Sequence, residues 1–122
     1  MEEGCGTHSD KFVNKMSDLI QIAGADDFNT AIQSGVVLVD FYADWCGPCR
    51  RLAPILEQIA ADFEGRAKII KVDTASSGDL ALRFGIESIP TLILFKNGEK
   101  IAVFNGIPRG GTLETALENA IG

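Results

Sequence analysis

The sequence predicts an α/β protein with one mixed sheet of about five strands flanked by about four helices. Short apolar runs rich in β-branched residues alternate with segments whose apolar residues recur at helical spacing, which is typical of a sheet covered by helices. The dipeptide Asn97-Gly98 lies between the last two strand-like runs and favours a tight hairpin turn. The last two strands should therefore be antiparallel.

The first half of the chain contains two expected strands and two expected helices. Residues 19–22 form a short apolar strand, and the helix expected at residues 25–33 ends at Ser34-Gly35. Residues 36–43 begin Val-Val-Leu-Val-Asp-Phe, a β-branched run suited to a strand that is buried on both faces. The helix expected at 47–63 has apolar residues at helical spacing, and Gly65 follows it as a residue favoured at helix ends.

The second half continues the same alternation. Residues 67–73 form the third expected strand, and a short helix at 77–84 ends before Gly85. The segments 91–96 and 100–105 flank the hairpin turn. A final helix is expected at 111–121, because five of its apolar residues share one face. They are Leu113, Ala116, Leu117, Ala120 and Ile121.

Length and composition indicate one small domain. With 122 residues, 46% of them apolar, the chain can bury a single core without structural disulfides. Its three cysteines are an odd number, which argues against a secreted framework of paired bridges. No basic region precedes an apolar one at the start, and no apolar run is long enough to span a bilayer. The net charge of −6 argues against sequence-independent nucleic-acid binding. We expect a cytoplasmic monomer that binds neither membrane nor nucleic acid.

The segment Trp45-Cys46-Gly47-Pro48-Cys49 lies where the strongest strand-like run gives way to a helix. Cys46 falls near the helix start, where free backbone N–H groups and the helix dipole favour a thiolate over a thiol. The thiolate is the species that attacks disulfides. The two cysteines can also bond to each other, so that one attacks and the other closes the cycle. The pattern indicates a dithiol switch in which only one sulfur should be exposed.

A zinc site is the alternative reading of this cysteine pair. Cys5-Gly6-Thr7-His8 would complete a nominal Cys3His ligand set with Cys46 and Cys49. It lies in a Gly- and charge-rich leader with nothing to define its position, so the redox interpretation is favoured. We expect residues 1–17 to be a leader, either flexible or a short helix, and residues 18–122 to be the domain. Cys5 would then be a free thiol.

Asp40 is the second residue with a chemical signature. An acid inside an apolar strand is costly to bury in its charged form, so burial should raise its pKa and let it hold a proton near neutral pH. Such groups often mark functional sites. The structural alternatives are an ion pair with Lys71 on a neighbouring strand, or an edge position that faces water.

Several segments together resemble the thioredoxin family. They are Val-Asp-Phe-Tyr-Ala-Asp-Trp-Cys-Gly-Pro-Cys at 39–49, Ala-Pro-Ile-Leu at 53–56, Lys-Val-Asp at 71–73, Phe-Gly-Ile at 84–86, Ile-Pro-Thr-Leu at 89–92 and Phe-Lys-Asn-Gly at 95–98. The resemblance covers roughly residues 18–122. It implies the thioredoxin fold and reduction of protein disulfides through a mixed-disulfide intermediate.

The resemblance also implies roles for individual residues. Cys46 is the attacking nucleophile, Cys49 resolves the mixed disulfide, Asp40 transfers a proton for Cys49, and Lys71 tunes the charge of Asp40. The Ile89-Pro90 bond is expected to be cis, whereas without the resemblance a trans turn proline is the default. The expected substrate-binding residues are Trp45, Gly47, Pro48, Ile89, Pro90, Gly106 and Ile107. Without the resemblance, those that are apolar side chains read as ordinary exposed surface.

The implied chemistry needs no bound cofactor beyond the redox-active Cys46–Cys49 disulfide. The resemblance implies that NADPH acts indirectly, through a thioredoxin reductase, and that clients include ribonucleotide reductase, peroxiredoxins and methionine sulfoxide reductases. An oxidant or isomerase of the same fold, and a binding or holdase subunit with an incidental dithiol, remain alternatives. The sequence departs from the family pattern at Tyr42, where tryptophan is frequent, and at Arg50-Arg51, where lysine and an apolar residue are typical. These two cations should further favour the Cys46 thiolate.

Overall fold

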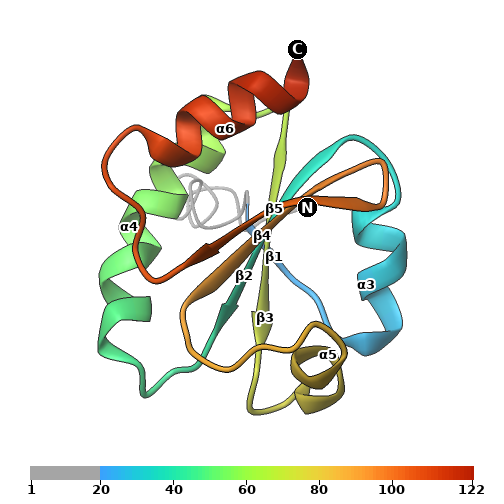
Figure 1. Cartoon of the computed structure of the whole chain (residues 1–122), viewed down its shortest axis with the longest axis vertical. Coiled ribbons are helices and arrows are strands. Elements are labelled where there is room, and N and C mark those ends of the chain that lie inside the picture. The colour runs from blue at the N-terminus through green and yellow to red at the C-terminus, as the bar shows by residue number, and fades with distance from the viewer. Residues whose placement is uncertain (1–19) are drawn as a thin grey trace, which may run out of the picture.

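The computed structural model describes residues 20–122, which form a five-stranded sheet with helices on both faces (Figure 1). The strand order is β1-β3-β2-β4-β5. The strands are β1 (Ile20–Ile22), β2 (Val36–Tyr42), β3 (Lys68–Asp73), β4 (Thr91–Lys96) and β5 (Glu99–Asn105). β1, β3 and β2 are parallel, whereas β4 runs antiparallel to both β2 and β5. The predicted mixed sheet and the antiparallel final hairpin are therefore confirmed.

The helices form two layers, one on each face of the sheet. α4 (Gly47–Asp62) and α6 (Thr112–Ile121) cover one face, and α3 (Ala25–Ile32) and α5 (Gly78–Arg83) cover the other (Figure 1). Each lies within a few residues of its predicted bounds. None of the helices that the structure describes is long and apolar enough to cross a membrane.

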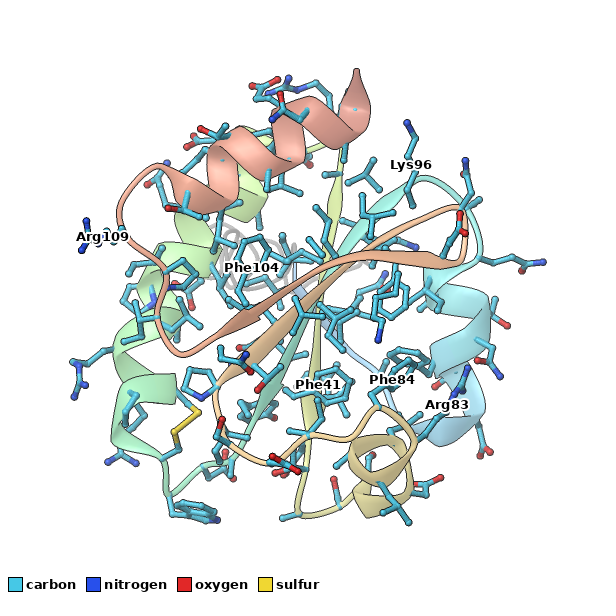
Figure 2. All side chains as sticks on the ribbon, in the orientation of Figure 1. Phe41, Arg83, Phe84, Lys96, Phe104 and Arg109 are labelled. Carbon is cyan, nitrogen blue, oxygen red and sulfur yellow. A yellow bond between two sulfur atoms is a disulfide. The ribbon has the colours of Figure 1, made fainter. Side chains whose placement is uncertain are left out.

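Strand β2 is buried on both faces, as its continuous apolar run predicts. Val36 and Leu38 belong to the core beneath α4 and α6, whereas Val37, Val39 and Phe41 belong to the core beneath α3 and α5. Because side chains alternate along a strand, Asp40 is directed toward the α4 layer. The rings of Phe41 and Phe84 lie 5.9 Å apart between centroids in the second core (Figure 2).

The pairing of β2 with β4 brings the two ends of the candidate site together. Phe41, near the end of β2, pairs with Thr91, the first residue of β4. The loop that follows β2 therefore lies beside the loop that precedes β4. Asn105, at the end of β5, pairs with Thr91 on its other side. Three segments that are distant in the sequence meet at this edge of the sheet.

Candidate active site

Cys46 and Cys49 form a disulfide at the start of α4, and their Cα atoms are 5.2 Å apart. Figure 2 shows this yellow bond at the N-terminal end of the helix. Cys46 is the N-cap residue, and the backbone N–H of Cys49 donates a hydrogen bond to its Sγ atom at 3.1 Å. Pro48 lies in the first turn, where its missing N–H is tolerated. The local sequence therefore places the Cys46 sulfur where an N–H group and the helix dipole stabilise negative charge.

The two cysteines are almost equally buried. Cys46 is 4% exposed and Cys49 is 5% exposed. The exposed fraction of each residue therefore does not distinguish the two cysteines in the disulfide form, and the exposure of a single sulfur in the dithiol stays a prediction. Their environments differ in hydrogen bonding instead. The Sγ atom of Cys46 accepts the Cys49 N–H and lies 3.9 Å from the carbonyl oxygen of Ile89.

The Ile89-Pro90 peptide bond is cis, as the resemblance implied, so the trans alternative is wrong. The bond directly precedes β4 and faces Cys46 across the site. The carbonyl oxygen of Pro90 accepts a hydrogen bond from the Gly106 N–H at 2.8 Å. This bond brings the loop after β5, which includes Ile107, to the same edge.

An apolar rim surrounds the disulfide. Trp45 is 75% exposed, and Pro48 and Ile107 are exposed as well. Trp45 and Ile89 also line a shallow hollow of about 200 Å³ beside the disulfide. Its other lining residues are Thr74, Ala81, Ile86, Glu87 and Ser88. No local sequence pattern marks Glu87, because only the folded chain brings it to the rim.

Asp40 is completely buried, so the edge position facing water is wrong. Within the described part of the chain, neither carboxyl oxygen has a hydrogen-bond partner. Burial raises the pKa of Asp40 from 3.8 to about 6, and the positive charge of Lys71 acts in the opposite direction. Burial is the larger effect because the carboxyl group has lost its water without gaining donors. The expected direction of the pKa change is confirmed.

Lys71 lies beside Asp40 in the sheet, but the two side chains form no ion pair. The two residues are in register on adjacent parallel strands. The ammonium nitrogen of Lys71 lies 4.3 Å from the centroid of the Tyr42 ring, in cation–π geometry. Tyr42 follows Asp40 by two residues, so both side chains are on one face of β2. The alternative of a structural Asp40–Lys71 ion pair is therefore wrong, and Tyr42 is a site residue that sequence analysis noted only as a departure from the family pattern.

Arg50 and Arg51 both fold back toward the loop that carries the disulfide. The Nη1 atom of Arg50 donates a hydrogen bond to the backbone oxygen of Asp44 at 2.6 Å. The Nη1 atom of Arg51 lies 3.8 Å from the position that a Cβ atom on Gly47 would occupy. Side chains in a helix lean toward its N-terminus, which brings both guanidinium groups to this loop.

Two members of the nominal zinc set, Cys5 and His8, lie outside the described residues. Within residues 20–122, no group of three or more His, Cys, Asp or Glu residues is arranged to hold a metal ion. In this structure Cys46 and Cys49 are bonded to each other.

Comparison with known proteins agrees with the geometry of this site. The thioredoxin family model matches residues 19–119. Thioredoxins from Staphylococcus aureus strains Mu50 and MW2 are 47% identical over 83 residues, which are 68% of this chain and 79% of each relative. A solved structure of the N21Q mutant thioredoxin from Halobacterium salinarum superposes with a TM-score of 0.78. That match has 32% sequence identity and covers 86% of this chain and 93% of the other.

The family, the fold and the disulfide at the start of α4 are mutually consistent. Thioredoxins reduce protein disulfides through a redox-active cysteine pair and have no bound cofactor. The chain belongs to the thioredoxin family and is a thioredoxin-type thiol–disulfide oxidoreductase.

Proposed function

We propose that Cys46 attacks the client disulfide and that Cys49 resolves the product. The Cys46 thiolate forms a mixed disulfide with one client sulfur, and the other client sulfur leaves as a thiolate that takes up a proton. Cys49 then loses its proton and attacks Cys46, which releases the second client thiol and forms the Cys46–Cys49 disulfide. The client gains two electrons and the dithiol loses two. The observation that carries this assignment is the hydrogen bond from the Cys49 N–H to the Cys46 sulfur.

We assign the proton transfer for Cys49 to Asp40. Its side chain is directed toward the layer that contains α4, the helix that carries Cys49. A pKa of about 6 lets the carboxylate accept a proton near neutral pH. Its lack of hydrogen-bond partners within the described residues leaves both oxygens available. Lys71 acts through its charge, and the Tyr42 ring holds its ammonium group.

Replacing Lys71 with methionine is expected to raise the pKa of Asp40 further, because the change removes the positive charge that lowers it. The pH at which the resolution step reaches half of its maximal rate should therefore move upward. The loss of rate near neutral pH should be smaller than the loss caused by removing Asp40 itself. NMR titration of the Asp40 carboxyl carbon measures the change directly. Lys68→Met removes the same charge from the first residue of β3 and should leave the titration unchanged. An unshifted Asp40 titration in Lys71→Met would show that Lys71 does not tune the acid.

We propose that clients bind across the apolar rim. Trp45, Gly47 and Pro48 would contact the client on one side of the disulfide, and Gly106 and Ile107 on the other. The cis Ile89-Pro90 segment would pair with an extended client segment. In the described chain the Ile89 N–H has no backbone partner, which suits the addition of a client strand at this point.

In the cell we place this chemistry in the cytoplasm, as electron transport from NADPH through a thioredoxin reductase to disulfide clients. Ribonucleotide reductase, peroxiredoxins and methionine sulfoxide reductases are the proposed clients, as expected for the family. Residues 18–122 are the proposed working domain, and residues 1–17 the leader. Residues 1–17 and their boundary with residue 18 lie outside the described residues.

The deciding experiment measures NADPH consumption with a thioredoxin reductase and a model protein disulfide. We expect sustained turnover that depends on this protein. A holdase subunit or a zinc module would show none. An oxidant or isomerase is distinguished by equilibration with glutathione buffers, because it would hold its disulfide far less stably than a reductase does. Conversion of the model protein disulfide without net NADPH consumption would contradict the proposed direction of electron flow.

A further inference from the structure

We infer that Arg50 and Arg51 form a docking site for an acidic client segment beside the disulfide under attack. The inference rests on the proposed function, because the client must present its disulfide to Cys46 while its neighbouring residues contact the rim. It adds a substrate class, namely disulfides flanked by carboxylate side chains.

The two arginines are placed by the helix that carries the dithiol. Both lie in the first two turns of α4 and are exposed. The guanidinium group of Arg50 is anchored at 2.6 Å to the Asp44 backbone, and that of Arg51 lies against Gly47, between the two cysteines. The two cations therefore lie against the two ends of the loop from Asp44 to Gly47, within reach of a segment that crosses the loop on the α4 side.

Neither arginine is neutralised within the described part of the chain. The ion pair found there joins Arg66 to Glu118, at the other end of α4. Arg50 uses a donor on a backbone oxygen, and a guanidinium group has five N–H donors, so both arginines keep donors for a carboxylate. Two unpaired guanidinium groups at the site of a protein with net charge −6 form a local positive patch. An acidic segment complements it.

The hollow beside the disulfide carries the opposite charge. Glu87 lines the hollow beside Trp45 and Ile89. An acidic residue bound there would meet a like charge, whereas one bound on the α4 side would meet the two arginines. Asp44 is also exposed on the loop, but its single charge is outnumbered by the two adjacent cations. The preferred client is therefore acidic on the side of its disulfide that crosses α4.

The experiment compares two disulfide-bonded peptides that differ only at the residues flanking the cysteine, with glutamate in one and glutamine in the other. Each position on either side of the cysteine is tested in turn. We expect the native protein to reduce the best glutamate peptide about fivefold more efficiently, measured as kcat/KM, since each exposed ion pair contributes modestly. High salt should remove the preference. The double variant Arg50→Gln with Arg51→Gln should also lose it.

The matched control is Lys96→Gln, which removes one positive charge from the last residue of β4. Lys96 is exposed and points away from the sheet at the end opposite to the disulfide (Figure 2). This variant should keep the fivefold preference. If the double variant instead slows both peptides equally, the arginines act on the Cys46 thiolate and the docking site is overturned.

A binding measurement separates this inference from the proposed function. Peptides with serine in place of cysteine cannot react, and their binding is followed through the fluorescence of Trp45, the single tryptophan in the sequence. Tighter binding of the acidic peptide, lost in the double variant, supports the docking site even if neither disulfide peptide is reduced. Efficient reduction of both disulfide peptides without any preference or salt dependence would overturn the docking site and leave the reductase function intact.

Discussion

Cys49→Ser is expected to trap client proteins as mixed disulfides, whereas Cys46→Ser should abolish reduction. Removing the attacking sulfur should lower turnover at least about a thousandfold, the scale of losing an enzyme's nucleophile. Removing Cys49 leaves the first step possible, because the Cys46 sulfur can still accept the backbone N–H of residue 49. The second step then has no resolving thiol, so the intermediate accumulates. Non-reducing gels and mass spectrometry of the trapped species provide the measurement.

Cys5 is the necessary control for this experiment, because it is the third cysteine of the chain and lies outside the described residues. All variants are therefore made again with Cys5→Ser, which should neither prevent trapping nor lower turnover. Trapping by Cys46→Ser in that background would reverse the assignment of the two cysteines. The near-equal burial of the two residues makes this a real test, since exposure does not distinguish them.

Asp40→Asn is expected to stabilise the protein at pH 7 while slowing reduction. A pKa raised from 3.8 to about 6 corresponds to about 3 kcal/mol, at roughly 1.4 kcal/mol for each pH unit. Between those two values the folded chain holds a proton that the unfolded chain has lost, so stability falls as the pH rises. Above pH 6 the full cost of a buried carboxylate is present. The amide carries no charge and avoids that cost.

Urea unfolding at two pH values measures this effect. At pH 7 the free energy of unfolding of Asp40→Asn should exceed that of the native protein by up to about 3 kcal/mol, and near pH 3 the two should be similar because Asp40 is then protonated in both states. Asp44→Asn is the matched control, since it removes an exposed carboxylate from the neighbouring loop. An equal gain at both pH values would show that the carboxylate charge is not the cause.

The kinetic half of the same prediction concerns the resolution step. Without a proton acceptor for Cys49, that step should slow by about a hundredfold near neutral pH, the lower range for general acid–base catalysis. The native pH–rate profile should rise through the pKa of Asp40, about 6, and the variant should lack this rise. Rapid-mixing kinetics with Trp45 fluorescence resolves the step. A variant with the native profile would exclude Asp40 from proton transfer.

Sequence patterns within one element were sufficient for most of the fold. The apolar run at 36–41 predicted a strand buried on both faces, and Asn97-Gly98 predicted the final hairpin, because strand burial and turn geometry depend on neighbouring residues. The same run predicted that Asp40 is buried with a raised pKa. Cys46 at a helix start was predictable for the same reason, since an N-cap is defined by the few residues around it.

The tertiary structure alone decided which distant residues meet at the site. Pairing of β2 with β4 brings Ile89 to Cys46, which is 43 positions away in the sequence. The position of Lys71 over Tyr42, rather than in an ion pair with Asp40, depends on the register between β2 and β3. The similar burial of the two cysteines depends on loops from separate strands. Local patterns determine periodicity, caps and turns, whereas these contacts depend on strand register and layer packing, which are set only when both faces of the sheet are covered.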